Sequence, residues 1–466
     1  MHLDYEPERR PTKSIRNYLI ILFNIIFLFV FINYLPYEPQ VNKGLALLIF
    51  VAVLWLTEAI HVTTTAVFVP VLAIALGLTD TKPALSSFAD PTIFLFLGGF
   101  VLAGALHVQK LDTIIANKIM FLAKGKLSLA VFYLFIATAV LSMWISNTAT
   151  VAMMLPLVVG VLGQLDKEKF HNTYVFVLLG IAYSASIGGM GTVVGSPPNA
   201  IVASQLDISF VDWMKMGLPM VVILLPIMIG IIFLVFKPQL NFTFKHTTEK
   251  IDMNSDRWIT LGIFFLTAIC WIFSKQLNPI FANLVGYGKP EFTNFDTFIS
   301  LGAFILICIS QVSRWKELQH NVDWGVLLLF GGGLTLSMVL KDSGASKVMA
   351  DLLVSMIKGS SFFIIGLVVA FFIVFLTEFT SNTASAALLV PIFISISTEL
   401  GMPPLGLSMI IGLGASCAFM LPVATPPNAL VFGTGDIKQK EMMKAGFFLN
   451  IICAVIISVV AYYFWL

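Results

Sequence analysis

The chain has 466 residues, of which 58% are hydrophobic and only 11% are charged. Soluble globular domains carry about a quarter of charged residues, so this composition excludes an ordinary soluble protein and indicates an all-α polytopic membrane protein. The formal net charge is +2 without a long tract of Lys or Arg, which argues against a nucleic-acid partner. The four cysteines stand alone in apolar runs, so neither a disulfide framework nor a zinc site is expected.

Apolar stretches of about twenty residues, long enough to cross a bilayer as helices, recur from residue 18 to the C-terminus. They do not resemble the short alternating strands of a transmembrane barrel. The first stretch follows Arg9, Arg10, Lys13 and Arg16 but ends without a small-residue cleavage site, which favours a retained helix over a signal peptide. About eleven crossings are predicted, at residues 18–36, 44–56, 60–79, 91–109, 174–206, 214–236, 258–275, 294–312, 323–340, 405–434 and 445–466.

Two further apolar blocks, 127–163 and 360–398, are each about twice as long as one crossing and carry polar residues near the middle. We interpret each block as a re-entrant hairpin. The alternative is two full crossings joined by a short loop. Both options leave the rest of the chain on the same sides of the membrane. The charged segments 110–126 and 341–358, just before the blocks, are expected to be amphipathic arms on the membrane surface. Solvated loops are the alternative.

Four regions follow from these elements. Residues 1–43 hold the N-terminal segment and first crossing, 44–237 the first repeat, 238–257 a cytoplasmic linker, and 258–466 the second repeat. The excess of Lys and Arg on predicted inner loops places the N-terminus in the cytoplasm and the C-terminus outside. An odd number of crossings, about five, separates the two hairpins, so the repeats are expected to be inverted, as in many secondary transporters. The strings 96–99 and 329–332, Phe-Leu-Gly-Gly and Leu-Phe-Gly-Gly, support the pairing.

The main clue to function is a doubled motif inside the two hairpins. Ser146-Asn147-Thr148-Ala149 recurs as residues 381–384, with a proline at the same distance in both copies, and each copy is followed by Pro-Pro-Asn-Ala at 197–200 or 426–429. Polar side chains at membrane depth are costly without a partner or ligand. A single copy is equally well explained by helix packing, but two matched pairs favour a ligand site.

The double prolines are expected to interrupt helices and to free the carbonyls of Val193, Val194, Pro422 and Val423, which suit a hard cation. Helix N-termini at the triplets favour an anion. No Lys or Arg occurs between 127 and 166, between 174 and 214, or between 359 and 437. A dianion there would need about two compensating positive charges, while each helix end offers roughly half a charge, so co-bound sodium is the economical solution.

These motifs closely resemble those of the divalent anion:sodium symporter family, the INDY-type carriers of dicarboxylates and citrate, over nearly the whole chain. The resemblance implies a homodimer, each protomer having a central scaffold and an elevator-type transport domain with substrate between the hairpin tips. It implies substrate contacts from Asn147, Thr148, Ser196, Asn382, Thr383, Thr425 and Pro426. It also implies two sodium sites, one near Ser142, Ser146, Asn147 and Gly195, the other near Thr377, Thr380, Asn382 and Ala424. Ser196 stands where the family usually has Thr.

Three other ionisable residues lie close to apolar runs. Glu58 and His61 flank a predicted helix junction, where capping is the favoured interpretation. Glu378 precedes Asn382 by one helical turn, and Met143 takes the matching place in the first half. Glu378 is therefore either an element of one cation site or a structural residue.

The predicted function is sodium-coupled symport of C4 or C5 dicarboxylates, such as succinate, malate, fumarate or 2-oxoglutarate, across the plasma membrane. A sodium-independent dicarboxylate exchanger of the same fold is the nearest alternative, and citrate or sulfate are less favoured substrates. An intramembrane hydrolase using Ser146 or Ser381, and an ion channel, are rivals of other classes. No G-x-S-x-G or H-E-x-x-H string supports a hydrolase, so we expect neither enzymatic activity nor an organic cofactor.

Overall fold

The computed structural model describes residues 15–244, 251–357 and 361–466. Within these ranges it is all-α apart from one isolated β-bridge. The helices of the first half are α1 (Ile15–Tyr34), α2 (Pro39–Thr57), α3 (Val62–Ala75), α4 (Thr81–Ser86), η1 (Ser87–Ala89), α5 (Pro91–Val108), α6 (Leu111–Leu122), α7 (Leu127–Ser142), α8 (Asn147–Leu162), α9 (His171–Gly189), α10 (Pro197–Gln205) and α11 (Phe210–Phe236).

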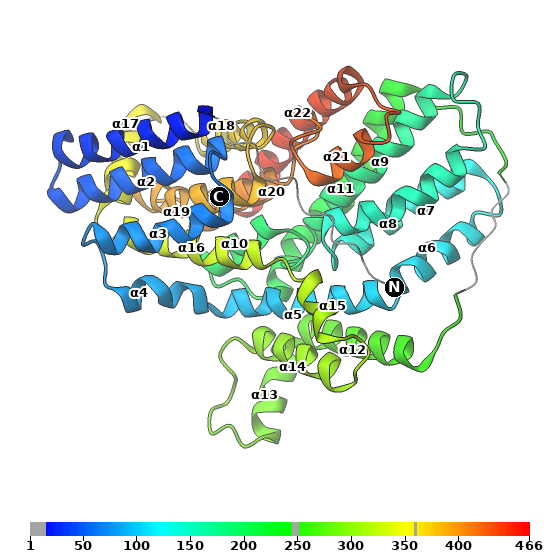
Figure 1. The fold of residues 1–466 in the computed structure, drawn as a ribbon, viewed down its shortest axis with the longest axis horizontal. Helices are drawn as coiled ribbons and strands as arrows, with labels where there is room; N and C mark the ends of the chain where they lie inside the picture. Colours follow the sequence, from blue (N-terminus) through cyan, green and yellow to red (C-terminus); the bar gives the residue numbers. More distant parts are fainter. Residues whose placement is uncertain (1–14, 245–250, 358–360) are drawn as a thin grey trace.

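The second half begins with α12, three residues before the predicted start of the second repeat at 258. Its helices are α12 (Ser255–Ile272), α13 (Ser274–Leu284), α14 (Phe295–Ile309), α15 (Trp315–Asn321), α16 (Trp324–Asp342), α17 (Ala345–Ile357), α18 (Phe362–Leu376), α19 (Asn382–Glu399), α20 (Pro404–Gly414), α21 (Pro426–Phe432) and α22 (Gln439–Phe464). In Figure 1, α12, α13 and α14 form a lobe below the rest of the molecule.

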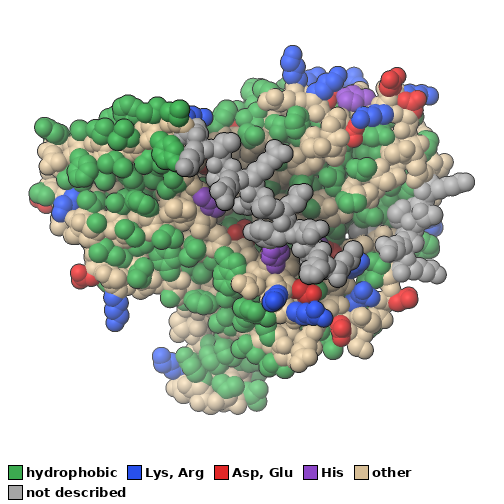
Figure 2. All heavy atoms as spheres, viewed as in Figure 1, with side chains coloured by type: hydrophobic (Ala, Val, Ile, Leu, Met, Phe, Trp, Pro, Cys, Tyr) green, Lys and Arg blue, Asp and Glu red, His purple; other side chains and the backbone are tan. Residues whose placement is uncertain are grey.

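Eight helical spans of the described chain are long and apolar enough to cross a membrane: Ile15–Tyr34, Pro39–Thr57, Thr81–Val108, His171–Gly189, Phe210–Phe236, Ser255–Ile272, Trp324–Asp342 and Gln439–Phe464. Their outer surfaces are apolar. Figure 2 shows hydrophobic side chains spread over the end of the molecule that holds α1, while charged groups gather near the opposite end. On α1, Leu22, Phe23 and Phe29 are all more than half exposed. Such a surface suits lipid rather than water.

The predicted crossings 174–206 and 405–434 were expected to be interrupted helices. Each is divided by an irregular segment, 190–196 in the first half and 415–425 in the second. Pro197 and Pro426 stand in the first turns of α10 and α21 and do not interrupt a longer helix. A proline fits there because the first amides of a helix have no intrahelical acceptor.

Helices of the two halves pack against each other. In one layer α5 packs on α14 and α16 packs on α3, so each glycine-rich helix contacts a helix of the other half. A Cβ on Gly98 would collide with the backbone of Ser300 on α14, and one on Gly332 would lie 2.5 Å from the carbonyl oxygen of Ala66 on α3. These glycines therefore permit close backbone contact between the halves.

A second layer contains the broken helices and the two predicted hairpins. Here α8 packs on α9 and α21, while α19 packs on α20 and α10. The second helix of each hairpin, α8 or α19, therefore contacts the short helix that begins at Pro-Pro in the other half, α21 or α10. Figure 1 shows α7, α8 and α9 side by side, with α21 close to α8.

The connecting segments agree with several smaller predictions. The expected amphipathic arms form α6 and α17. Glu58 ends α2 with a left-handed backbone (φ 47°), and His61 caps α3 by accepting a hydrogen bond from the amide of Thr63 at 3.3 Å. Capping is therefore the role of this junction, as expected.

Candidate functional site

Each Ser-Asn-Thr triplet starts a helix after a short break in the hairpin. Ser146 caps α8 by accepting from the amide of Ala149 at 3.3 Å, and Ser381 caps α19 by accepting from the amide of Ala384 at 3.4 Å. The Asn and Thr that follow therefore lie in the first turn, where the free amides and positive dipole end of the helix are located. At 16 residues each, α7 and α8 are about 24 Å long, which is shorter than the hydrocarbon core of a bilayer.

The irregular segment of each broken helix is tied by the asparagine of its Pro-Pro-Asn motif. Asn199 donates to the carbonyl oxygens of Gly189 and Thr192 at 2.8 and 2.7 Å. Asn428 donates to those of Ala418 and Leu421, at 3.0 Å in both cases. Both asparagines are fully buried. The sequence motif identified these residues, but it did not reveal that they fasten the unwound backbone.

Oxygen atoms from three segments converge on the side-chain amide of Asn147. One amide atom lies 2.6 Å from Ser142 Oγ, 3.1 Å from the carbonyl oxygen of Ala185 and 3.3 Å from that of Gly195. With nitrogen in this place, Asn147 donates hydrogen bonds to these acceptors. With Oδ1 in this place, the amide oxygen adjoins the oxygens of Ser142, Ala185 and Gly195, an all-oxygen set of the kind that hard cations bind. Three of the four predicted residues of the first sodium site, Ser142, Asn147 and Gly195, are therefore together, and Ser146 caps the adjoining helix.

Two glycines leave the space for this cradle of oxygens. A Cβ on Gly189 would collide with Asn147 Oδ1 and lie 2.9 Å from the carbonyl oxygen of Gly195. A Cβ on Gly195 would lie 2.5 Å from the carbonyl oxygen of Gly189. Side chains at these positions would fill the cradle, which fits a site for a small cation.

The second half lacks this pair of glycines. Counting from the shared Pro-Pro-Asn, Ala418 and Ala424 take their places. Asn382 Oδ1 is buried without a hydrogen-bond donor. The hydroxyl of Thr377 donates to the carbonyl of Val374 at 3.2 Å, and that of Thr380 lies 3.0 Å from the carbonyl of Leu376 and 2.8 Å from Ser385 Oγ.

Glu378 fastens the irregular segment of the second half. Its carboxylate accepts from the amides of Phe419, Met420 and Leu421 at 2.7, 2.8 and 3.0 Å, and from Asn450 Nδ2 at 2.7 Å. The side chain is 1% exposed. Four N–H donors compensate a buried anion that would otherwise be costly. These contacts support the structural role that was one of the two expected for Glu378.

Residues of the two halves line one open cleft of about 530 Å³, between α8 and α21. The lining has no charged side chain and consists of Thr148, Leu155, Pro426, Ala429, Leu430, Gly433 and Thr434. Two predicted substrate contacts, Thr148 and Pro426, therefore face the same space from opposite halves. Asn382 and Thr383 are partly buried on α19 and do not line this cleft.

The two remaining predicted substrate residues are buried and have protein partners. Ser196 is 4% exposed, and its Oγ lies 3.3 Å from Ser416 Oγ of the other broken helix. Thr425 is 6% exposed and caps α21 by accepting from the amide of Asn428 at 3.2 Å. The contact between Ser196 and Ser416 brings the two irregular segments side by side.

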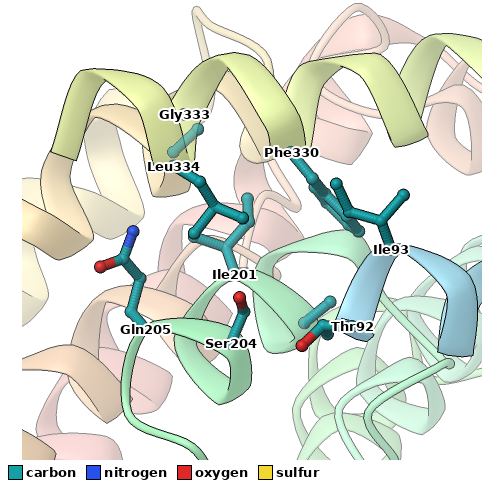
Figure 3. Close-up of a pocket in the computed structure, with 10 residues that line it drawn as sticks. Thr92, Ile93, Ile201, Ser204, Gln205, Phe330, Gly333 and Leu334 are labelled. Carbon is teal, nitrogen blue, oxygen red and sulfur yellow. The ribbon is translucent and has the colours of Figure 1, made fainter. Parts of the chain in front are cut away.

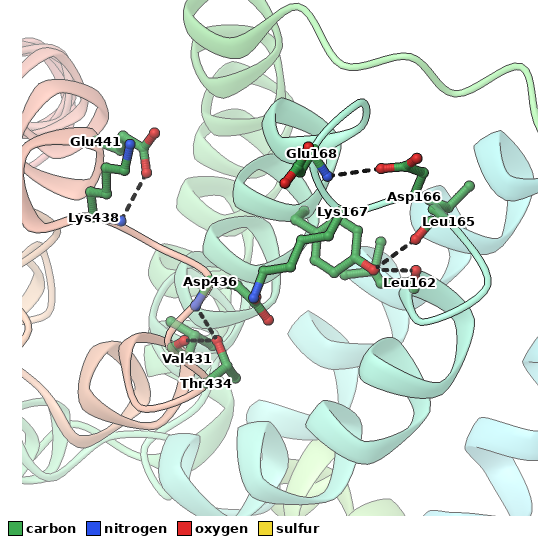
Figure 4. A network of polar contacts seen from close by, with 11 residues as sticks. Leu162, Leu165, Asp166, Lys167, Glu168, Val431, Thr434, Asp436, Lys438 and Glu441 are labelled. Atoms are coloured by element: carbon green, nitrogen blue, oxygen red, sulfur yellow. Dashed lines mark hydrogen bonds and ion pairs between the residues drawn. The ribbon is translucent and has the colours of Figure 1, made fainter.

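Polar contacts join the two halves near the cleft. Lys167, in the loop before α9, forms an ion pair with Asp436 (Figure 4). His171 Nε2 lies 2.7 Å from Glu441 Oε1 of α22. The hydrogen bond to Asp436 raises the pKa of Lys167. The amide of Asp436 also donates to Thr434 Oγ1 at 3.3 Å, so the ion pair adjoins the cleft lining. Among the described residues, no group of His, Cys, Asp and Glu could form a transition-metal site.

Comparison with known proteins agrees with this architecture. Residues 52–395 match the model of the family CitMHS, described as citrate transporter. An uncharacterized transporter of Haemophilus influenzae is 63% identical over 459 residues, covering 98% of this chain and 99% of the relative. The sodium-dependent dicarboxylate transporter SdcS of Staphylococcus aureus strain USA300 is 35% identical over 496 residues, covering 98% of this chain and 92% of the relative.

A solved structure, that of the YdaH transporter of Alcanivorax borkumensis, has a TM-score of 0.58 at 14% identity and covers 87% of this chain and 99% of that chain. The similarity shows a shared fold. The family model and the sequence relatives place this protein among transporters and not among enzymes. The protein belongs to the CitMHS citrate transporter family and, with its SdcS relatives, to the divalent anion:sodium symporters.

Proposed function

We propose that this transporter carries C4 or C5 dicarboxylates across the plasma membrane together with sodium. The observation that carries the proposal is the cradle formed by Asn147, Ser142 and the carbonyls of Ala185 and Gly195, beside an open cleft without basic side chains. A dianion in such a cleft needs cations that the protein does not supply. The name of the SdcS relatives, sodium-dependent dicarboxylate transporter, supports the same substrate and ion.

In this proposal Asn147 and Thr148 of α8, and Asn382 and Thr383 of α19, offer amide and hydroxyl donors to the substrate carboxylates. Pro426, Ser196 and Thr425 shape the ends of the two broken helices around it. One sodium is held by the cradle at Asn147. The second lies near Asn382, Thr377, Thr380 and Ala424, where Asn382 Oδ1 has no donor.

The conformational cycle is proposed to follow an elevator mechanism. Two repeats with opposite orientation in the membrane would exchange their conformations, so that the cleft opens first on one side and then on the other. The layer with α5, α14, α3 and α16 would be the fixed scaffold, and the layer with the hairpins and broken helices would move. We also propose a homodimer with cytoplasmic N-termini and extracytoplasmic C-termini.

Uptake by the purified protein in liposomes tests the proposal. An inward sodium gradient should drive accumulation of labelled succinate, and potassium should not replace sodium. Uptake that ignores sodium but requires internal dicarboxylate would overturn symport and establish the exchanger. Unlabelled citrate and sulfate in excess should compete less well than malate, and the reverse order would change the substrate class.

The asparagines of the two triplets offer a second test. Asn147→Ala and Asn382→Ala should each abolish uptake while the protein still inserts and purifies. Asn33→Ala is the matched control, because Asn33 lies in α1 and its amide only donates to the carbonyl of Phe29, four residues earlier. Near-normal uptake by either triplet variant would contradict a shared site.

A further inference from the structure

The open cleft has a counterpart in the other half of the molecule. Counting from the shared Pro-Pro-Asn, the cleft residues Ala429 and Leu430 of α21, and Gly433 and Thr434 directly after it, correspond to Ala200, Ile201, Ser204 and Gln205 of α10. All four of the latter line one small void (Figure 3). The same face of the short helix is therefore open in one half and covered in the other.

The cover comes from the helices of the first layer. Thr92 and Ile93 of α5 and Phe330, Gly333 and Leu334 of α16 lie over α10 and leave a void of only about 10 Å³, compared with about 530 Å³ in the open cleft. The helices α19 and α16 also pack on each other. Their equivalents in the first half, α8 and α5, share at most a marginal contact in the described chain. The two halves therefore differ in conformation as the two sides of an alternating-access carrier would.

Two hydrogen bonds cross the covered face. Ser204 donates to Asp90 Oδ1 at 3.2 Å, and Ser337 of α16 donates to Gln205 Oε1 at 3.0 Å. Asp90 is itself the cap of α5, where its Oδ1 accepts from the amide of Thr92 at 2.8 Å. We call these two bonds the α10 latch.

The other half cannot form an equivalent latch. Gly433 stands in the place of Ser204, and Ala103 stands in the place of Ser337, counted from the glycine pairs at 98–99 and 332–333. Neither has a side chain that can form a hydrogen bond. If the halves exchanged conformations, the scaffold would cover α21 without regaining either bond.

We propose that the α10 latch makes the conformation with α10 covered and α21 exposed the resting state of the carrier, and that Asp90, Ser204, Gln205 and Ser337 are positioning residues for the access switch. This inference rests on the proposed transport function. One intramolecular hydrogen bond corresponds to about a fivefold change in the population ratio, so each bond gives a measurable bias.

Cross-linking across the covered face tests the proposal. Ile201→Cys and Leu334→Cys, which line the same void, are combined in a protein whose four native cysteines are replaced by serine. In proteoliposomes without substrate, the pair should cross-link rapidly with a short bifunctional maleimide. Adding Ser204→Ala or Ser337→Ala should slow this cross-linking, and it should raise about fivefold the rate at which a single Ile201→Cys reacts with a monofunctional maleimide, because that reaction needs the minor, uncovered state. It should also lower maleimide labelling of a separate Ala429→Cys variant in the open cleft.

Two controls separate the latch from general effects. Ser337→Thr keeps the hydroxyl and should retain the parent rate. Ser395→Ala removes a hydroxyl that bonds only within α19, to the carbonyl of Pro391, and should leave cross-linking unchanged. Unchanged rates in the latch variants, or equal slowing in Ser395→Ala, would overturn the proposal. Should Ser337→Ala not fold, Gln205→Ala removes the same bond from the other side. Because no substrate is present, the result is independent of whether dicarboxylates are transported.

Discussion

The rings of Phe96 and Phe330 pack edge to face at the centre of the first layer, with centroids 5.1 Å apart and an interplanar angle of 87°. Each ring stands two residues before a glycine that meets the backbone of the other half, Gly98 or Gly332. The two phenylalanines thus occupy the same place in the two halves and contact each other. This register pairs Gly98 with Gly332, whereas alignment of the strings 96–99 and 329–332 would pair it with Gly331. The three successive glycines at 331–333 fit either register, so the sequence does not decide between them.

We expect the two rings to stabilise each other. Edge-to-face aromatic pairs contribute about 0.5–1.5 kcal/mol beyond their buried area. A double-mutant cycle of Phe96→Leu and Phe330→Leu, measured by thermal unfolding of the detergent-solubilised protein, should give a coupling of this size. Phe265→Leu, at a 57% exposed position, is the control and should be additive with either change. Complete additivity of the Phe96 and Phe330 variants would mean that the contact contributes nothing specific.

Gly189→Ala should impair sodium binding more than it impairs folding. The added methyl group would occupy the cradle beside Asn147 Oδ1 and the carbonyl of Gly195. We expect the sodium concentration for half-maximal uptake to rise at least tenfold, and the thermal stabilisation by sodium in the absence of substrate to fall. Gly160→Ala is the control, since a Cβ there meets nothing within 4 Å. Equal sodium dependence in both variants would remove the cradle as a sodium site.

Asn199→Ala and Asn428→Ala should both abolish transport, because each frees two buried carbonyls of an irregular segment. Leaving buried polar groups unpaired costs about 1–3 kcal/mol each, so the unfolding temperature should also fall. Hydrogen exchange should increase within residues 190–196 and 415–425 respectively, each in its own variant only. An increase spread evenly over the molecule would mean that the asparagines stabilise the fold generally.

Glu378→Gln should destabilise the second half although the side chain keeps its size. The new amide group has to face one of the amide donors of Phe419, Met420 or Leu421, so donor meets donor. Loss of a charged hydrogen-bond acceptor costs about 1.5–3 kcal/mol. The loss should appear as a lower unfolding temperature and reduced uptake at all sodium concentrations. Glu399→Gln, at the exposed end of α19, should match the parent; a selective change in sodium affinity would instead make Glu378 a cation ligand.

Long apolar helices were predictable because hydropathy and length determine them directly. For α5 and α16 the expected limits agree with the structure within two residues. The helix α13 was not expected, since its sequence from Ser274 to Leu284 has no long apolar run and contains Pro279. The breaks before α10 and α21 were expected, and Val193, Val194, Pro422 and Val423 lie within them. The prolines were treated as interior residues, but they stand in the first turns of α10 and α21, where proline is also favoured.

The candidate site was predictable in its residues and not in its contacts. The repeated triplets identified Asn147, but the acceptors around its amide come from Ala185 and Gly195, which are joined to it only by the packing of α8 on α9. Glu378 finds its three backbone donors more than forty residues further along the chain. No local pattern encodes such pairs, because they depend on how the irregular segment folds back.

The asparagine ties of the two irregular segments also determine how long those segments can be. In both halves the amide reaches carbonyls ten and seven residues earlier in the chain. Adding or removing a single residue between the nearer carbonyl and the asparagine would displace both acceptors at once. Loops usually tolerate insertions and deletions, but these two should tolerate none, and their lengths should vary far less among relatives than those of the surface loops.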